Sequence, residues 1–243
     1  MSIFLAPEEF IQGFMSLILL VIFTISGFLI LIKYFKYKHT ALLLIGISLL
    51  GLACPWYPSG FNFTYVIITG QSFSDELYFF LGNFFIPFIS VIYIWGITEL
   101  IYQDKQKVLV IIYAIIGAAF EILFLYFLFA DLSVIGYRSG VFSTEHTSFV
   151  LIYLLFLNFS VVIFGFLFAR ESLKSDDPEI KLKGKLLLLA FISFLIGVLF
   201  DAGIDLGPIF LVLIRILLMS SAVEFYLGFL LPDWFKRLIL KNK

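Results

Sequence analysis

The chain has 243 residues, of which 62% are hydrophobic and only 14% are charged, whereas about a quarter of an ordinary soluble domain is charged. A soluble fold of this size could not bury so much apolar surface, and the long apolar runs lack the alternation of a β-barrel. The net charge of -1 excludes the concentrated basic face of a nucleic-acid-binding protein. Cys54 is the only cysteine, which excludes an internal disulfide.

Apolar runs of about 20 residues, the length needed to cross a hydrocarbon core of about 30 Å, recur along the chain. They predict an all-α membrane protein, a seven-transmembrane helix bundle that forms one domain over residues 1–243. The predicted spans are 8–34, 39–56, 76–101, 107–130, 147–170, 184–202 and 206–231. Residues 57–75 are ambiguous, because Pro58, Gly60, Asn62 and Gly70 favour a loop or a half-buried hairpin over an eighth span.

The positions of Lys and Arg predict the orientation, since cytoplasmic loops collect these residues. All 16 except Arg138 and Arg215 follow the first, third, fifth or seventh span. We therefore expect a multi-pass protein of the cell membrane with its N-terminus outside and its C-terminus in the cytoplasm. Glu8 and Glu9 precede the first span, unlike the basic start of a signal peptide, so this span is expected to remain as an anchor.

Residues 232–243 predict a short amphipathic helix that lies on the inner leaflet, or else an aromatic and basic stop after the last span. The apolar face comprises Trp234, Phe235, Leu238 and Ile239, and Lys236, Arg237 and Lys241 surround it. The sequence contains no soluble domain, and its longest inner loop is 171–183. A signal to the cytoplasm would therefore pass through a separate partner that contacts residues 171–183 and 232–243.

Several chemistries lack the residues that they require. Every lysine lies in a loop, at a span end or in the tail, which excludes a retinal Schiff base within the bundle. His39 and His146 lie at opposite faces, which excludes a shared metal. Asp201 and Asp205 resemble the paired carboxylates of aspartyl proteases, but helix-end capping and solvation fit them better. We predict no enzyme activity, cofactor or metal.

Ionisable residues at membrane depth are costly, so each is a candidate functional residue. Arg215 in the seventh span and Glu121 in the fourth each lie about 13 Å below the outer surface, which predicts a charge-assisted pair. Asn83 and Asn158 lie at about 10 and 16 Å. These four residues predict either a ligand pocket that opens from outside or a clamp that fixes helix packing.

A second polar group is expected near the inner face. Glu99 and Glu224 approach the membrane edge beside Arg170. They are candidates for a proton or switch relay, although snorkelling and pairing with the basic loops fit them better.

Two segments carry a resemblance to a known family. The residues that carry it are Lys183, Gly184, Lys185, Leu186 and Leu187, with Phe225, Tyr226, Gly228, Phe229, Pro232, Trp234 and Lys236. In these positions the chain resembles uncharacterised archaeal seven-span membrane proteins, which are similar to the seven-helix sensor region of prokaryotic histidine kinases. The resemblance implies a sensor or receptor-like module for a small molecule. Unlike the kinases, the chain is expected to lack a kinase domain; the alternatives are a small-solute or ion transporter and a structural scaffold subunit.

Overall fold

The fold was analysed in a computed structural model that describes residues 3–203 and 207–240. Over these residues, seven helical segments are long and apolar enough to cross a membrane. The helices are α1 (Pro7–Leu31), α2 (Lys33–Tyr37), α3 (Thr40–Leu52), α4 (Tyr57–Thr69), α5 (Asp75–Asn83), α6 (Ile86–Ile101), α7 (Gln106–Ala130), α8 (Ser148–Leu173), α9 (Pro178–Gly203), α10 (Pro208–Leu230) and α11 (Asp233–Leu240). This confirms an all-α bundle of seven apolar segments.

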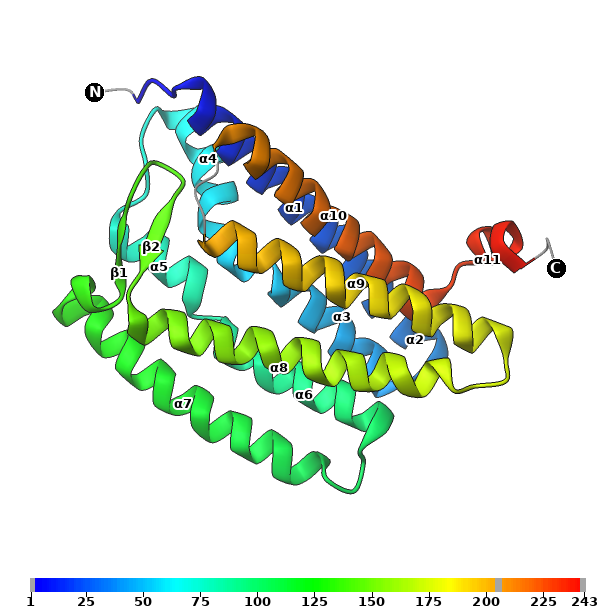
Figure 1. The fold of residues 1–243 in the computed structure, drawn as a ribbon. Helices are drawn as coiled ribbons and strands as arrows, with labels where there is room; N and C mark the ends of the chain where they lie inside the picture. The colour runs from blue at the N-terminus through cyan, green and yellow to red at the C-terminus, as the bar shows by residue number, and fades with distance from the viewer. Residues whose placement is uncertain (1–2, 204–206, 241–243) are drawn as a thin grey trace.

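The helices pack side by side as a bundle with α7 and α10 at opposite edges (Figure 1). α10 packs on α9 and α1, whereas α7 packs mainly on α6. In the middle of the bundle, α8 contacts both α6 and α9. Small residues permit this closeness: a Cβ at Gly165 of α8 would lie only 2.2 Å from the Phe191 ring of α9. This arrangement decides which polar side chains can meet.

The second apolar segment is longer than predicted. A 3-10 helix η1 (Cys54–Trp56) joins α3 to α4, and Thr40–Thr69 forms one candidate span. The prediction of a loop or hairpin at residues 57–69 was therefore wrong. Pro55 and Pro58 lie in the first turn of η1 and α4, where a missing N–H costs nothing. Gly70 ends α4 in the left-handed conformation at φ 69°.

A small β-hairpin covers the end of the bundle at α4 and α5. Its strands β1 (Gly136–Arg138) and β2 (Thr144–His146) are antiparallel and follow a 3-10 helix η2 (Leu132–Val134). Asn62 Nδ2 donates to the Val141 carbonyl at 2.9 Å, and Ser59 Oγ donates to the Phe142 carbonyl at 2.9 Å. We call this the hairpin end. The hairpin carbonyls thus accept hydrogen bonds from polar side chains of α4, in a segment whose sequence favours a loop.

Arg138 fastens the hairpin to the connection between α4 and α5. Its guanidinium donates to the Phe73 carbonyl and to Ser72 Oγ, each at 3.0 Å. It also lies 4.5 Å from the centroid of the Tyr78 ring. This basic residue, which lies apart from the others in sequence, therefore has a structural role at the hairpin end.

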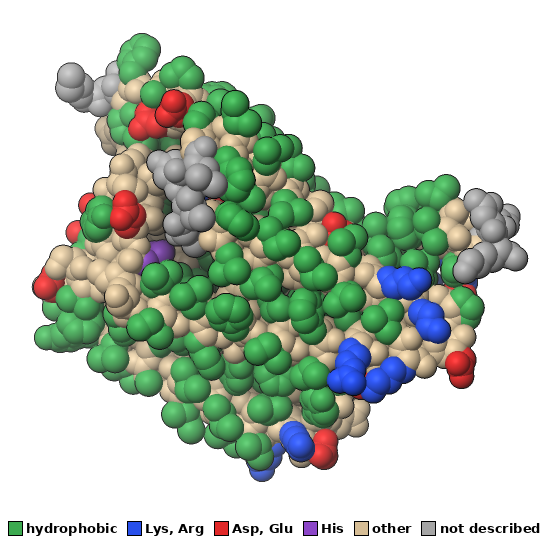
Figure 2. All heavy atoms as spheres, viewed as in Figure 1, with side chains coloured by type: hydrophobic (Ala, Val, Ile, Leu, Met, Phe, Trp, Pro, Cys, Tyr) green, Lys and Arg blue, Asp and Glu red, His purple; other side chains and the backbone are tan. Residues whose placement is uncertain are grey.

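Most of the other basic side chains gather at the opposite end, which we call the basic end (Figure 2). It comprises α2, the connections α6–α7 and α8–α9, and α11. α11 is amphipathic, with Trp234, Leu238 and Ile239 exposed. Lys236 of α11 forms an ion pair with Glu179 at the start of α9. This hydrogen bond raises the pKa of Lys236, so α11 is tied electrostatically to the bundle.

Candidate functional site

Arg215 forms a buried ion pair, but its partner is Asp201 and not Glu121. Arg215 Nε lies 2.6 Å from Asp201 Oδ1, and the two side chains are 5% and 13% exposed. The predicted pair between Glu121 and Arg215 is therefore wrong. The two residues do not meet because their helices are not neighbours. α10 contacts α9 and α1, while α7 lies at the opposite edge of the bundle (Figure 1). The predicted solvent-facing role of Asp201 is wrong too, and Asp205 lies outside the described residues.

Two further residues complete what we call the Arg215 clamp, formed by Ser16, Trp56, Asp201 and Arg215. Arg215 Nη1 donates to Ser16 Oγ at 2.9 Å, and Ser16 Oγ donates to the Gln12 carbonyl at 2.8 Å. Trp56 Nε1 donates to Asp201 Oδ2 at 2.7 Å. Both carboxylate oxygens are thus paired. The clamp joins α1, η1, α9 and α10, and its satisfied geometry is that of a packing device.

Glu121 lies in a different environment, on the buried face of α7. The residue is 9% exposed, and neither carboxylate oxygen has a hydrogen-bond partner within the part of the chain that the structure describes. Gly117, one turn earlier on the same face, lets α7 approach α6: a Cβ there would lie 3.2 Å from Pro87 Cβ and 3.6 Å from Tyr153 Oη. The carboxylate therefore faces the contact between α6, α7 and α8.

By residue count, Asn83 lies at about the same depth as Glu121. The short connection between α6 and α7 makes these helices antiparallel, and Gly117 lies opposite Pro87. Four residues back from Pro87 and four forward from Gly117 therefore reach the same depth. Asn83 is 2% exposed, and its Nδ2 donates to the Phe79 carbonyl at 3.0 Å. Its Oδ1 is buried and unpaired across residues 3–203 and 207–240.

Tyr153 of α8 closes the group. Its ring stacks on Phe120 with the centroids 3.8 Å apart, and its hydroxyl lies near the Ser90 hydroxyl and within electrostatic range of Glu121. Ser90 Oγ donates to the Pro87 carbonyl at 2.7 Å, while Tyr153 Oη has no hydrogen-bond partner among the described residues. We call Asn83, Ser90, Glu121 and Tyr153 the acceptor layer.

Asn158 is only loosely related to this layer. It follows Tyr153 by five residues on α8, about 7 Å further toward the basic end. It is 9% exposed, and its Oδ1 also lacks a partner in the described ranges. Counted along the helices, Asn83 and Glu121 thus lie at about one level and Asn158 about one and a half turns away, whereas Arg215 is bound in the clamp.

The candidates near the basic end are not joined to one another. Arg170 is exposed, and none of the ion pairs between described residues connects it with Glu99 or Glu224. Glu224 Oε2 is buried without a partner in the same part of the chain. The described geometry contains no continuous relay through these three residues.

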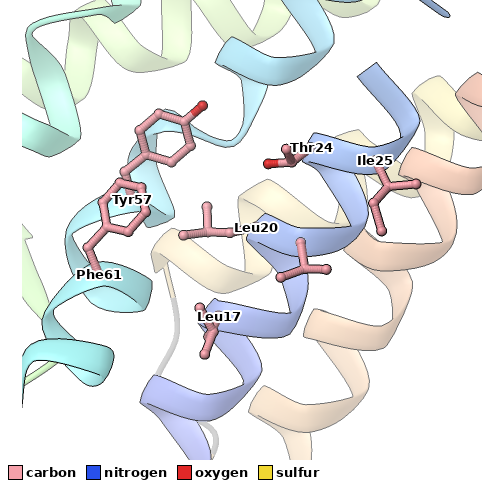
Figure 3. Close-up of a pocket in the computed structure, with 7 residues that line it drawn as sticks. Leu17, Leu20, Thr24, Ile25, Tyr57 and Phe61 are labelled. Atoms are coloured by element: carbon pink, nitrogen blue, oxygen red, sulfur yellow. The ribbon is translucent and has the colours of Figure 1, made fainter. Parts of the chain in front are cut away.

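An apolar pocket of about 320 Å³ lies between α1 and the start of α4 (Figure 3). The residues that line it include Leu17, Leu20, Thr24, Ile25, Tyr57 and Phe61. Hydrocarbon side chains predominate, and Tyr57 Oη is already bonded to the Leu50 carbonyl at 2.9 Å. This pocket suits a hydrocarbon chain and contains none of the predicted polar site residues.

One residue of these sites could have been found from sequence, and three could not. Asp201 is an acidic residue near a span end, which the sequence does show, but it was interpreted as a helix cap. Trp56 gave no polar signal, because only its N–H is used. Ser90 and Tyr153 are common residues in membrane helices, and only their positions relative to Glu121 single them out.

The comparisons with known proteins add no family to this picture. No protein-family model matches the chain, and the search of curated proteins found no match.

Proposed function

We propose that the protein is a multi-pass membrane sensor that binds a small ligand at the acceptor layer and signals to a separate cytoplasmic partner at the basic end. The observation that carries the proposal is the Glu121 carboxylate, which is buried and has no hydrogen-bond partner among the described residues. An unpaired buried carboxylate is costly. A group retained at such a cost is better explained by a ligand than by packing.

The unequal satisfaction of polar groups supports the same proposal. The Arg215 clamp pairs both Asp201 oxygens and fixes α1, α9 and α10. The acceptor layer, on α5 to α8, contains buried oxygens that find no partner within the described chain. The helices of the clamp are thus held together by satisfied hydrogen bonds, whereas the helices of the acceptor layer carry polar groups that a ligand would satisfy. Ligand binding would then move α8 relative to the clamp.

The orientation follows from the charge pattern. The hairpin end would lie outside and the basic end in the cytoplasm, because Lys and Arg collect on the cytoplasmic side. The output surface would comprise the α8–α9 connection and α11, which the ion pair between Lys236 and Glu179 holds together. The resemblance to sensor regions of histidine kinases agrees with such an output.

The test measures whether Glu121 influences the basic end. In a cysteine-free background, Ser175→Cys and Leu238→Cys are spin-labelled in lipid nanodiscs, and their distance distribution is compared with and without Glu121→Gln. We expect Glu121→Gln to shift the distribution. The matched control is Glu145→Gln on the exposed hairpin, which should leave it unchanged. An identical distribution in all three proteins would refute coupling and favour a scaffold.

A transporter is the second candidate, favoured by the break between α5 and α6. Phe84 and Phe85 separate these helices, and Pro87 is the second residue of α6. A proline at such a place allows a helix to bend. Broken helices beside a buried carboxylate also occur in transporter sites. Accumulation of a solute by proteoliposomes, abolished by Glu121→Gln, would establish transport in place of sensing.

A further inference from the structure

We propose that the ligand of the acceptor layer is a small monovalent cation. This inference rests on the proposed function and specifies the chemical class of its ligand. It starts from the atoms that lack partners among the described residues: Asn83 Oδ1, Glu121 Oε1 and Oε2, and Tyr153 Oη. Each of them is an oxygen that can accept a hydrogen bond or coordinate a cation.

Several donors around this layer are bonded to other groups, and the charged group among its four residues is the Glu121 carboxylate. Asn83 Nδ2 is bonded to the Phe79 carbonyl, and Ser90 Oγ donates to the Pro87 carbonyl. The Arg215 guanidinium, which the sequence analysis predicted to pair with Glu121, is bound by Asp201 and Ser16 instead. An anionic ligand would therefore meet a carboxylate and unpaired oxygens. A positively charged ligand would neutralise the carboxylate, and unpaired oxygens of the layer could coordinate the same charge.

The charge and the atom type favour a monovalent ion. Hard cations prefer oxygen ligands, and the unpaired set consists of oxygens with one carboxylate. A single carboxylate neutralises one positive charge, whereas a divalent ion would leave an uncompensated charge in a low-dielectric layer. In the described part of the chain, no group of three or more His, Cys, Asp or Glu side chains could hold a multivalent ion.

The close packing of the layer favours a bare ion over an organic cation. Gly117 approaches Pro87 so closely that an added Cβ would lie 3.2 Å from it, and the Tyr153 ring is stacked on Phe120. Neither the apolar pocket between α1 and α4 nor the small space around Ser48 and Tyr93 includes a residue of the acceptor layer. An ion can fit between helices where a larger molecule cannot.

The test is the thermal stability of the purified protein in nanodiscs, in NaCl and in choline chloride at equal ionic strength. A ligand that binds only the folded state raises the melting temperature with its concentration. We expect Na⁺ to raise it and choline, which is too bulky for the layer, to leave it unchanged. Glu121→Gln should abolish the Na⁺ effect. Tyr153→Phe keeps the ring stacking and should weaken Na⁺ binding by about tenfold, the loss of one ligand oxygen.

The matched control is Asp201→Asn, which lowers the stability but leaves the acceptor layer intact, so its Na⁺-dependent rise should persist. Equal melting temperatures in both salts, or a Na⁺ effect that survives Glu121→Gln, would overturn the cation site. The spin-label comparison separates the two proposals. A shift caused by Glu121→Gln without any Na⁺ effect would retain the sensor and reject its ligand class.

Discussion

The partner of Arg215 can be decided by removing one charge at a time. Asp201→Asn keeps the shape of the side chain but leaves the guanidinium, which is 5% exposed, without its counter-charge. Breaking a buried ion pair typically costs about 3–5 kcal/mol. The Ser16 hydroxyl still accepts from Arg215, so we expect a loss of about 3 kcal/mol. Arg215→Gln should cost a similar amount, because it leaves Asp201 with only its bond to Trp56.

Two double-mutant cycles then separate the observed pair from the one that depth alone predicts. The assay is reversible unfolding in mixed micelles as a denaturing detergent is added. Asp201→Asn with Arg215→Gln should lose less than the sum of the singles, with a coupling of about 0.5–3 kcal/mol. Glu121→Gln with Arg215→Gln should be additive to within about 0.5 kcal/mol. Additivity in the first cycle, or coupling in the second, would refute the assignment of the clamp.

Three other predictions test the ends of the bundle. Burial lowers the pKa of His146 from 6.5 to about 4, so between these pH values the unfolded state binds one proton more than the folded state. The free energy of unfolding should therefore fall by up to about 3 kcal/mol as the pH drops from 6.5 to 4. A pH series of melting temperatures should show this fall, and His146→Gln should flatten it. In a cysteine-free background, an impermeant thiol reagent should label Ser143→Cys on intact cells and Ser175→Cys only after permeabilisation; the reverse pattern would invert the orientation. Lys236→Gln removes the ion pair with α9 and should increase the mobility of a spin label at Leu238, while an unchanged spectrum would show that the ion pair does not hold α11.

The seven apolar segments were predictable because span length and hydropathy are local properties. The second segment was the exception. Pro58, Gly60 and Asn62 are turn residues in most contexts, but Pro58 lies in the first turn of α4 and Asn62 is bonded to Val141 and Phe73. These bonds join residues far apart in sequence, so no local pattern reveals them.

The depth of each candidate residue in the membrane was predictable, but the neighbours of its helix in the bundle were not. Counting residues along a span places Glu121, Asn83 and Arg215 at similar heights. Height does not say which helices are neighbours, and α10 packs on α9 and α1 while α7 packs on α6. Asn83 and Glu121 lie on consecutive spans, so counting along the chain suffices to group them by height. Arg215 could not be assigned, because its partner was hidden among residues that resemble a helix cap.

The bonds between α4 and the hairpin also imply an order of events during synthesis. Asn62 and Ser59 wait for carbonyls 79 and 83 residues further along the chain. At about 5–20 residues per second, this delay lasts from about 4 to 16 seconds. During that time the third and fourth long helices are made, and the native partners available to Asn62 and Ser59 are nearer ones, such as Ser72 Oγ and Tyr78 Oη. The second segment thus completes its contacts with the hairpin only after the fourth long helix has emerged, so a substitution that displaces the hairpin should leave these contacts of α4 unformed.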